Sequence, residues 1–167
     1  MKFFPKIAKY ANIYFISLVL TLTQVFYPVS AHADATCTGQ YKLAFEGPIT
    51  GNSADIGNQM LSAMQNYLNY FLVNNSSTVT NLSSQITVID DQGEPQKAIQ
   101  AVTKSISDPC ILGVVGPAFS GAAIATLSLY DNAGLTTISP SASSPNLNVN
   151  KGSHFLRLTT SYTNMYN

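Results

Sequence analysis

Three short segments of the sequence combine proline with glycine or hydroxyl residues, and they are the first candidates for a binding site. They cover residues 47–51 (GPITG), 116–121 (GPAFSG) and 139–144 (SPSASS). Small residues let backbone N–H groups point outward without shielding by bulky side chains. An N–H group that also begins a helix carries positive partial charge. The pattern therefore predicts a site for a small anion or carboxylate.

The same segments lack the groups that catalysis needs. None contains a His, Cys, Lys, Asp or Glu that could act as base, nucleophile or metal ligand, and a hydroxyl without a neighbouring base serves as a hydrogen-bond donor. Residues 51–57 have neither the lysine of a triphosphate-binding loop nor the spacing of a dinucleotide fingerprint. We therefore expect binding without turnover, no cofactor and no enzyme activity.

Two adjacent acids, Asp90 and Asp91, allow a second interpretation as a catalytic pair. We favour a structural role, in which they begin a turn and cap the helix that opens at Pro95. Ser120 and Ser143 could likewise be helix caps or turn formers, and a residue can do this and also bind a ligand.

Short β-rich runs alternate with helical periods along the chain. Strands are predicted at residues 41–46, 85–89, 111–115, 135–139 and 155–158. Apolar spacings of three and four predict a helix across residues 56–71, whose Met60, Met64, Tyr67 and Phe71 should be core. Further helices should run from Pro95 to a point before Pro109 and over residues 120–132, the last with Ile124 and Leu127 inward. This order predicts an α/β fold with an open parallel sheet and helices on both faces.

Such a sheet places ligands outside the carboxyl ends of its strands. The three candidate segments all leave strands at that edge. Cys37, Cys110 and His154 fall at strand starts, which is the opposite edge. The fold and the loop chemistry therefore indicate the same location for a site.

Residues 1–33 have the layout of a secretory signal peptide. Lys2, Lys6 and Lys9 precede an apolar run that ends in a small-x-small site before Asp34. The alternative is an uncleaved membrane anchor. After cleavage, five basic and eight acidic residues remain, for a net charge of about −3. That charge argues against nucleic-acid binding, and we expect an exported protein with no stable membrane insertion and a single domain over residues 34–167.

Export makes Cys37 and Cys110 candidates for one disulfide, because the compartment permits oxidation. Each cysteine stands just ahead of a predicted apolar strand. If those strands are parallel neighbours, both thiols lie at one edge of the sheet. The alternative is two unpaired cysteines. A metal site is not expected, since the mature chain adds only His154 to these two potential ligands.

Four motifs, taken in order, resemble the periplasmic branched-chain amino-acid-binding proteins, the type I solute-binding proteins of ABC transporters. The motifs occupy residues 42–51, 90–98, 114–121 and 138–143. The resemblance implies the first of two α/β lobes that close on an amino acid. It implies ligand contacts from the residues that occupy the family's positions: Ser120, Gly121, Ser141, Ala142 and Ser143. Hydroxyls come from Ser120 and Ser143, and mainly backbone groups from the others. Ile56 falls where many members place an aromatic residue that covers the ligand.

Length is the main departure from this family, because the sequence stops after the fifth predicted strand and lacks a second lobe. We interpret it as the N-terminal part of a binding protein, from a truncated gene, a split gene or an incomplete record. The resemblance implies a periplasmic location, an amino acid or similar small carboxylate as ligand, and an ABC transporter permease as partner. A ligand-sensing or regulatory module on the same fold is the alternative.

Overall fold

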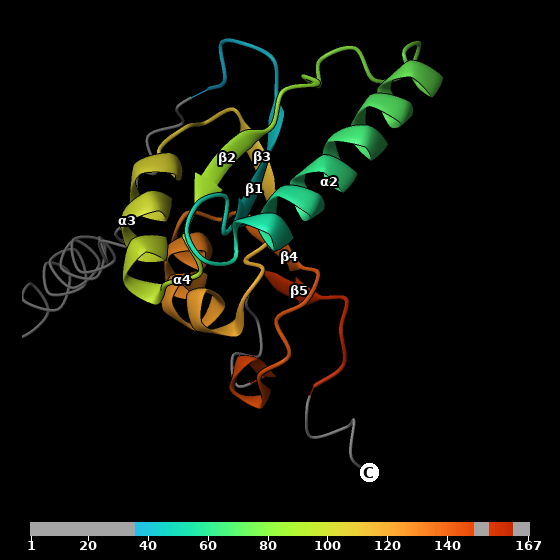
Figure 1. The fold of residues 1–167 in the computed structure, drawn as a ribbon. Coiled ribbons are helices and arrows are strands. Elements are labelled where there is room, and N and C mark those ends of the chain that lie inside the picture. Colours follow the sequence, from blue (N-terminus) through green and yellow to red (C-terminus); the bar gives the residue numbers. More distant parts are fainter. Residues whose placement is uncertain (1–35, 149–153, 162–167) are drawn as a thin grey trace, which may run out of the picture. The chain divides into compact units, whose positions relative to one another are not determined.

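The computed structural model describes residues 36–148 and 154–161, and the predicted signal peptide lies outside them. Figure 1 shows the order of the elements. They are β1 (Lys42–Gly47), α2 (Ala54–Asn74), β2 (Thr87–Asp90), α3 (Pro95–Ser105), β3 (Ile111–Val115), α4 (Ser120–Asn132), β4 (Thr136–Ser139), the 3-10 turn η1 (Pro145–Asn148) and β5 (Phe155–Arg157). Within the described residues, no helix has the length and apolar character needed to cross a bilayer.

The strands form one sheet in the order β2-β1-β3-β4-β5, and every neighbouring pair is parallel. Parallel pairing requires a crossover between strands, and α2, α3 and α4 supply it for the first three connections. The predicted α/β class with an open parallel sheet is therefore confirmed. Among the described residues, the five strands and three α-helices lie within a few residues of their predicted positions, whereas η1 was not predicted.

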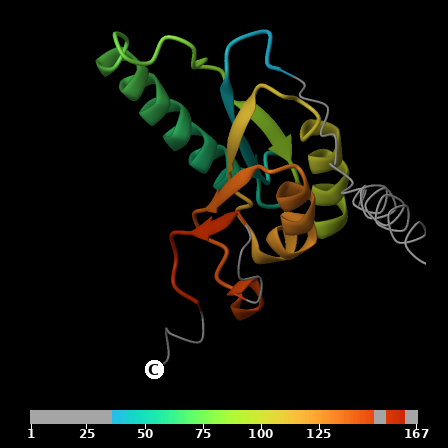
Figure 2. The ribbon, with the colours of Figure 1, turned by 180° about the vertical axis from the view of Figure 1, so that it is seen from behind.

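Helices cover both faces of the sheet, as Figures 1 and 2 show. α2 lies on one face, whereas α3 and α4 lie together on the other. The main core forms between the sheet and α3 and α4, where the apolar side chains of Ala44, Ile89, Val102, Ile111, Val114 and Tyr130 pack together. Pro95 is the first residue of α3, where its fixed φ angle suits a helix start and its missing N–H is not needed.

Three expectations about burial are wrong, and two of them concern the less well covered side of the sheet that carries α2. Tyr67 is 68% exposed, although its helical spacing predicted a core position. Leu112 of β3 is exposed, although helices were predicted on both faces of the sheet. Ile124, predicted to point inward from α4, is also exposed, whereas its neighbour Leu127 is buried as expected. An apolar cavity of about 330 Å³ separates α2 from the sheet, because one helix cannot cover five strands.

The edge of the sheet where the strands begin is closed by a disulfide between Cys37 and Cys110, which confirms that prediction. The Lys42 backbone N–H donates a 2.9 Å hydrogen bond to the Cys110 carbonyl oxygen. Lys42 also forms a salt bridge with Asp108, with 2.7 Å between Nζ and Oδ2. These contacts anchor the segment before β1 to the segment before β3, far from the candidate loops.

Candidate functional site

The candidate loops lie together at the carboxyl edge of the sheet. β1, β2, β3 and β4 are parallel neighbours, so the loops that follow them leave the sheet on the same side. We call the four segments after these strands, residues 47–51, 90–94, 116–121 and 139–144, the rim. The rim has the placement that a ligand site requires in this type of sheet.

Serine side chains bind the β3 and β4 loops of the rim to each other. The Ser120 oxygen accepts hydrogen bonds from the backbone N–H groups of Ser143 and Ser144, each 3.1 Å long. The Ser139 hydroxyl donates to the Pro117 carbonyl at 2.6 Å, and the Ser141 hydroxyl donates to the Ala118 carbonyl at 2.5 Å. The two loops are consequently one rigid unit.

Five of the six predicted ligand contacts belong to this unit. Ser120 is the first residue of α4, and Gly121 is the second and is exposed. Ala142 is buried. The Ser141 hydroxyl donates to the β3 loop, which leaves its backbone as the part that could contact a ligand. Ser143 is 8% exposed, and within the described chain its hydroxyl makes no hydrogen bond. The Ser143 hydroxyl therefore has capacity for a ligand, and the Ser120 hydroxyl, which only accepts in its described bonds, can still donate one.

Ile56, the sixth predicted residue, stands apart from the other five. It lies in the first turn of α2, which follows the β1 loop, and it is 41% exposed. No described contact joins it to the β3 and β4 loops. The structure therefore places Ile56 at the rim end of α2, apart from the unit that the β3 and β4 loops form through their serine hydrogen bonds, which we call the serine unit.

The start of α4 makes the serine unit electrically attractive to an anion. No acidic residue lies in the first turn of this helix, and its N-cap, Phe119, offers no side-chain oxygen to the first N–H groups. The positive end of the helix dipole therefore remains uncompensated by the helix's own first turn. A ligand carboxylate placed beside Ser120 and Gly121 would receive this partial charge.

Asp90 holds the β1 loop of the rim in place. Its Oδ1 accepts hydrogen bonds from the backbone N–H groups of Ile49, Thr50 and Gln92 at 3.0–3.1 Å, and its Oδ2 accepts one from the Thr50 hydroxyl at 2.6 Å. Burial alone raises the pKa of Asp90, but these hydrogen bonds outweigh that effect, and the pKa lies below its ordinary value. Asp90 is thus an ionised scaffold residue.

The expectation for the acidic pair was partly wrong. Asp90 and Asp91 form the turn as predicted, and Asp91 accepts a 2.7 Å hydrogen bond from the Gly93 N–H. Neither caps α3, because the N-cap is Glu94 and no side chain caps it. The described hydrogen bonds of both carboxylates are made within the rim, before the helix begins.

Arg157 is a residue of the site that the sequence analysis missed. It ends β5, and its Nη1 donates a 2.9 Å hydrogen bond to the Ser144 carbonyl, which supports the β4 loop from the far side. The signal was the alternation along β5: Phe155 packs on the α4 side of the sheet, so Arg157 must point to the same side.

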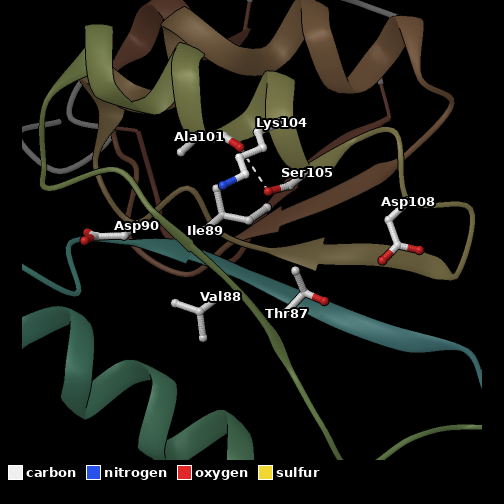
Figure 3. Close-up of a pocket in the computed structure, with 8 residues that line it drawn as sticks. All are labelled: Thr87, Val88, Ile89, Asp90, Ala101, Lys104, Ser105 and Asp108. Atoms are coloured by element: carbon white, nitrogen blue, oxygen red, sulfur yellow. Dashed lines mark hydrogen bonds between the residues drawn. The ribbon is translucent and has the colours of Figure 1, made fainter.

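The groove along the edge strand β2 is a different feature, drawn in Figure 3. It has a volume of about 420 Å³ and lies between β2 and the last turns of α3, with Asp90 at one end and Asp108 at the other. It contains none of the predicted ligand contacts. Its position along the strand, instead of across the strand ends, sets it apart from the rim.

Comparison with known proteins places the chain among binding proteins. Residues 40–166 match the family model described as periplasmic binding protein. The Leu/Ile/Val-binding protein BraC3 of Rhizobium johnstonii is 29% identical over 132 residues, which cover 79% of this chain and 33% of that protein.

Solved structures agree with the sequence relatives. The substrate-binding protein LivJ of Streptococcus pneumoniae, in complex with isoleucine, matches with a TM-score of 0.59 and 25% identity over 73% of this chain and 34% of that one. A solute-binding protein of an R. palustris ABC transporter, in complex with benzoate, matches with a TM-score of 0.59 at 22% identity, over 74% of this chain and 33% of that one. The chain thus spans about a third of the length of these relatives.

Proposed function

The chain belongs to the periplasmic binding protein family, and from this premise we propose that it is an exported solute-binding protein that captures an amino acid or a similar small carboxylate for an ABC importer. The family is one of binding proteins, which agrees with the expectation of binding without turnover. Residues 1–33 would direct export, the periplasm would be the location, and the transporter permease would be the partner.

The observation that carries this proposal is the serine unit. Ser120 holds the amides of Ser143 and Ser144, which sets the Ser143 hydroxyl beside the uncompensated start of α4. These groups can donate hydrogen bonds to a carboxylate, and the rim residues that would contact it bring no reactive group of their own. Similarity to isoleucine-binding LivJ and to BraC3 supports an aliphatic amino acid as the ligand.

One wall of a cleft buries less of its ligand than two, so we expect weak binding by this chain alone. The matched part of this chain covers only about a third of each relative's length, and we propose that the opposite wall of the site comes from a second lobe like theirs. That lobe would supply the partner for the ligand's ammonium group.

The direct test is calorimetric titration of the chain with isoleucine, isoleucinamide and benzoate. Isoleucinamide lacks the carboxylate, so its binding should be much weaker than that of isoleucine. Ser143→Ala should weaken isoleucine binding by about 1 kcal/mol, roughly fivefold, because one hydrogen bond to a charged group is lost. Ser128→Ala, an exposed serine on α4, is the matched control and should bind as the wild type does. Equal affinity of the wild type and Ser143→Ala would contradict the proposal.

A further inference from the structure

Two carboxyl groups are completely buried beneath the rim. Glu46, near the end of β1, and Asp91, directly after β2, are both 0% exposed. The Tyr130 hydroxyl of α4 donates a 2.6 Å hydrogen bond to Glu46 Oε2, and Asp91 Oδ1 accepts from Gly93. The other oxygens, Glu46 Oε1 and Asp91 Oδ2, have no hydrogen-bond partner among the described residues. Buried polar atoms without partners are rare and need an explanation.

The electrostatic surroundings of the pair contain no compensating positive charge among the groups that act on it. The pKa of Glu46 is raised to about 8, mainly by burial and further by the charge of Asp91, against a lowering by the Tyr130 hydrogen bond. Burial and the charge of Asp90 also raise the pKa of Asp91, whereas its hydrogen bond from Gly93 lowers it. If both acids were ionised, two buried negative charges would face each other unpaired, which is strongly unfavourable.

The pair is connected to three of the four rim segments. The Asp91 backbone N–H donates a 3.2 Å hydrogen bond to the Gly47 carbonyl, and the Asp91 carbonyl accepts one of 2.9 Å from Glu94. Gly116, with a φ of +131°, packs directly on the Glu46 main chain, where a Cβ atom would clash with the Glu46 carbonyl. The main chains of Glu46 and Asp91 are therefore in direct contact with the loops after β1, β2 and β3.

We propose that Glu46 and Asp91 together hold one proton at neutral pH, carried by Glu46, and that this proton fixes the geometry of the rim. The protonated Glu46 is neutral and adds a hydrogen-bond donor to a region where two buried carboxyl oxygens have no described partner. Both acids are positioning residues, since neither is among the predicted ligand contacts. Only the importance of this geometry for ligand capture rests on the proposed function.

The first test is infrared spectroscopy of the folded chain in heavy water at neutral pH. The C=O stretch of a protonated carboxyl group should be present and should disappear above pH 8. Glu46→Gln, which has the size and neutrality of the protonated acid, should lack this band. Glu94→Gln, which removes an exposed carboxyl nearby, should retain it. Absence of the band from the wild type at neutral pH, or its persistence in Glu46→Gln, would overturn the proposal.

The second test is the pH dependence of stability, measured by urea unfolding. The folded state keeps the proton between the ordinary value of 4.5 and about 8, so the wild type should lose stability as the pH rises through this window and level off above it. The difference between the wild type and Glu46→Gln should show this trend. Tyr130→Phe removes a hydrogen bond that lowers the pKa, so it should move the upper end of the window to higher pH. A stability that depends on added sodium, potassium or calcium instead of pH would show that the pair binds a cation and would overturn the proposal.

The third test reads the rim itself and uses no ligand, so its failure is separate from failure of the proposed function. Amide hydrogen exchange of residues 47–51, 90–94 and 116–121 is compared between the wild type and Glu46→Gln on both sides of pH 8. Above that pH the wild type should exchange several-fold faster than the variant at these residues, and below it the two should agree. Equal exchange at every pH would contradict the positioning role.

Discussion

The Ser120 side-chain oxygen lies 3.1 Å from the backbone nitrogen of Ser143 and accepts its hydrogen bond, so the first residue of α4 fixes the loop after β4. The same oxygen accepts from Ser144. This relationship turns two loops that are 23 residues apart in sequence into the single unit on which the proposed site depends. Ser120 therefore acts first as a scaffold for Ser143.

Ser120→Ala should leave two part-buried N–H groups without a partner. We expect the free energy of unfolding to fall by about 1–3 kcal/mol, because unsatisfied donors lose the full value of their hydrogen bonds. Ser128→Ala should change it by less than about 0.5 kcal/mol, as is usual for exposed positions. Urea unfolding of the wild type and the two variants measures both values. A Ser120→Ala variant as stable as Ser128→Ala would show that the Ser120 hydrogen bonds do not stabilise the fold.

Asp90→Asn should loosen the β1 loop, because an amide can no longer accept hydrogen bonds at both ends of the side chain. We expect a loss of about 1 kcal/mol at neutral pH. The pKa of Asp90 is lowered in the folded protein, so its contribution is present above the ordinary value of 3.8 and is lost as the pH falls below it. The wild type should therefore converge on the variant in acid, and Glu94→Gln serves as the exposed control. A difference in unfolding free energy between the wild type and Asp90→Asn that grew as the pH fell would contradict this prediction.

Gly57→Ala sets helix propensity against packing. Gly57 lies within α2, where alanine is ordinarily about 1 kcal/mol better than glycine. Here a Cβ atom would collide with the carbonyl of Pro48 in the β1 loop, and we expect a net loss of about 1–3 kcal/mol. Asn66→Ala, at an exposed position of the same helix, should be neutral or slightly stabilising. A stabilising Gly57→Ala would mean that α2 does not press on the rim loop.

Reduction of the Cys37–Cys110 disulfide should destabilise the fold by about 2–4 kcal/mol, since the bridge spans 73 residues. Thermal unfolding with and without dithiothreitol measures this effect. The reductant should have no effect on a Cys37→Ser/Cys110→Ser double variant, which should already unfold at the lower temperature. An identical midpoint for the reduced and oxidised wild type would refute a stabilising role.

Local patterns carried enough information to predict the fold. The continuous apolar run of β3 predicts a strand, and the proline at the start of α3 predicts a helix start. Neither prediction needs information from the rest of the chain. The burial of individual side chains was harder to predict from the sequence, because it depends on which other elements pack against them. Tyr67 has the spacing of a core residue, yet it is exposed because α2 alone covers its side of the sheet.

The candidate site was predictable in position but not in detail. Parallel strands oblige the loops to meet at one edge, which follows from sequence order. The division of labour between Ser120 and Ser143 depends on a hydrogen bond across 23 residues, and no local pattern encodes it. The burial of Glu46 was equally hidden, because its partner Tyr130 lies 84 residues away on α4.

The most direct measurement is a map of the isoleucine-induced chemical shift changes in the backbone amides of the chain. Our account predicts that the largest changes fall on Ser120, Gly121 and residues 141–143, and that Ser143→Ala weakens the response to isoleucine. Changes concentrated at Lys104 and Ser105 in the groove beside β2, with a silent rim, would contradict it.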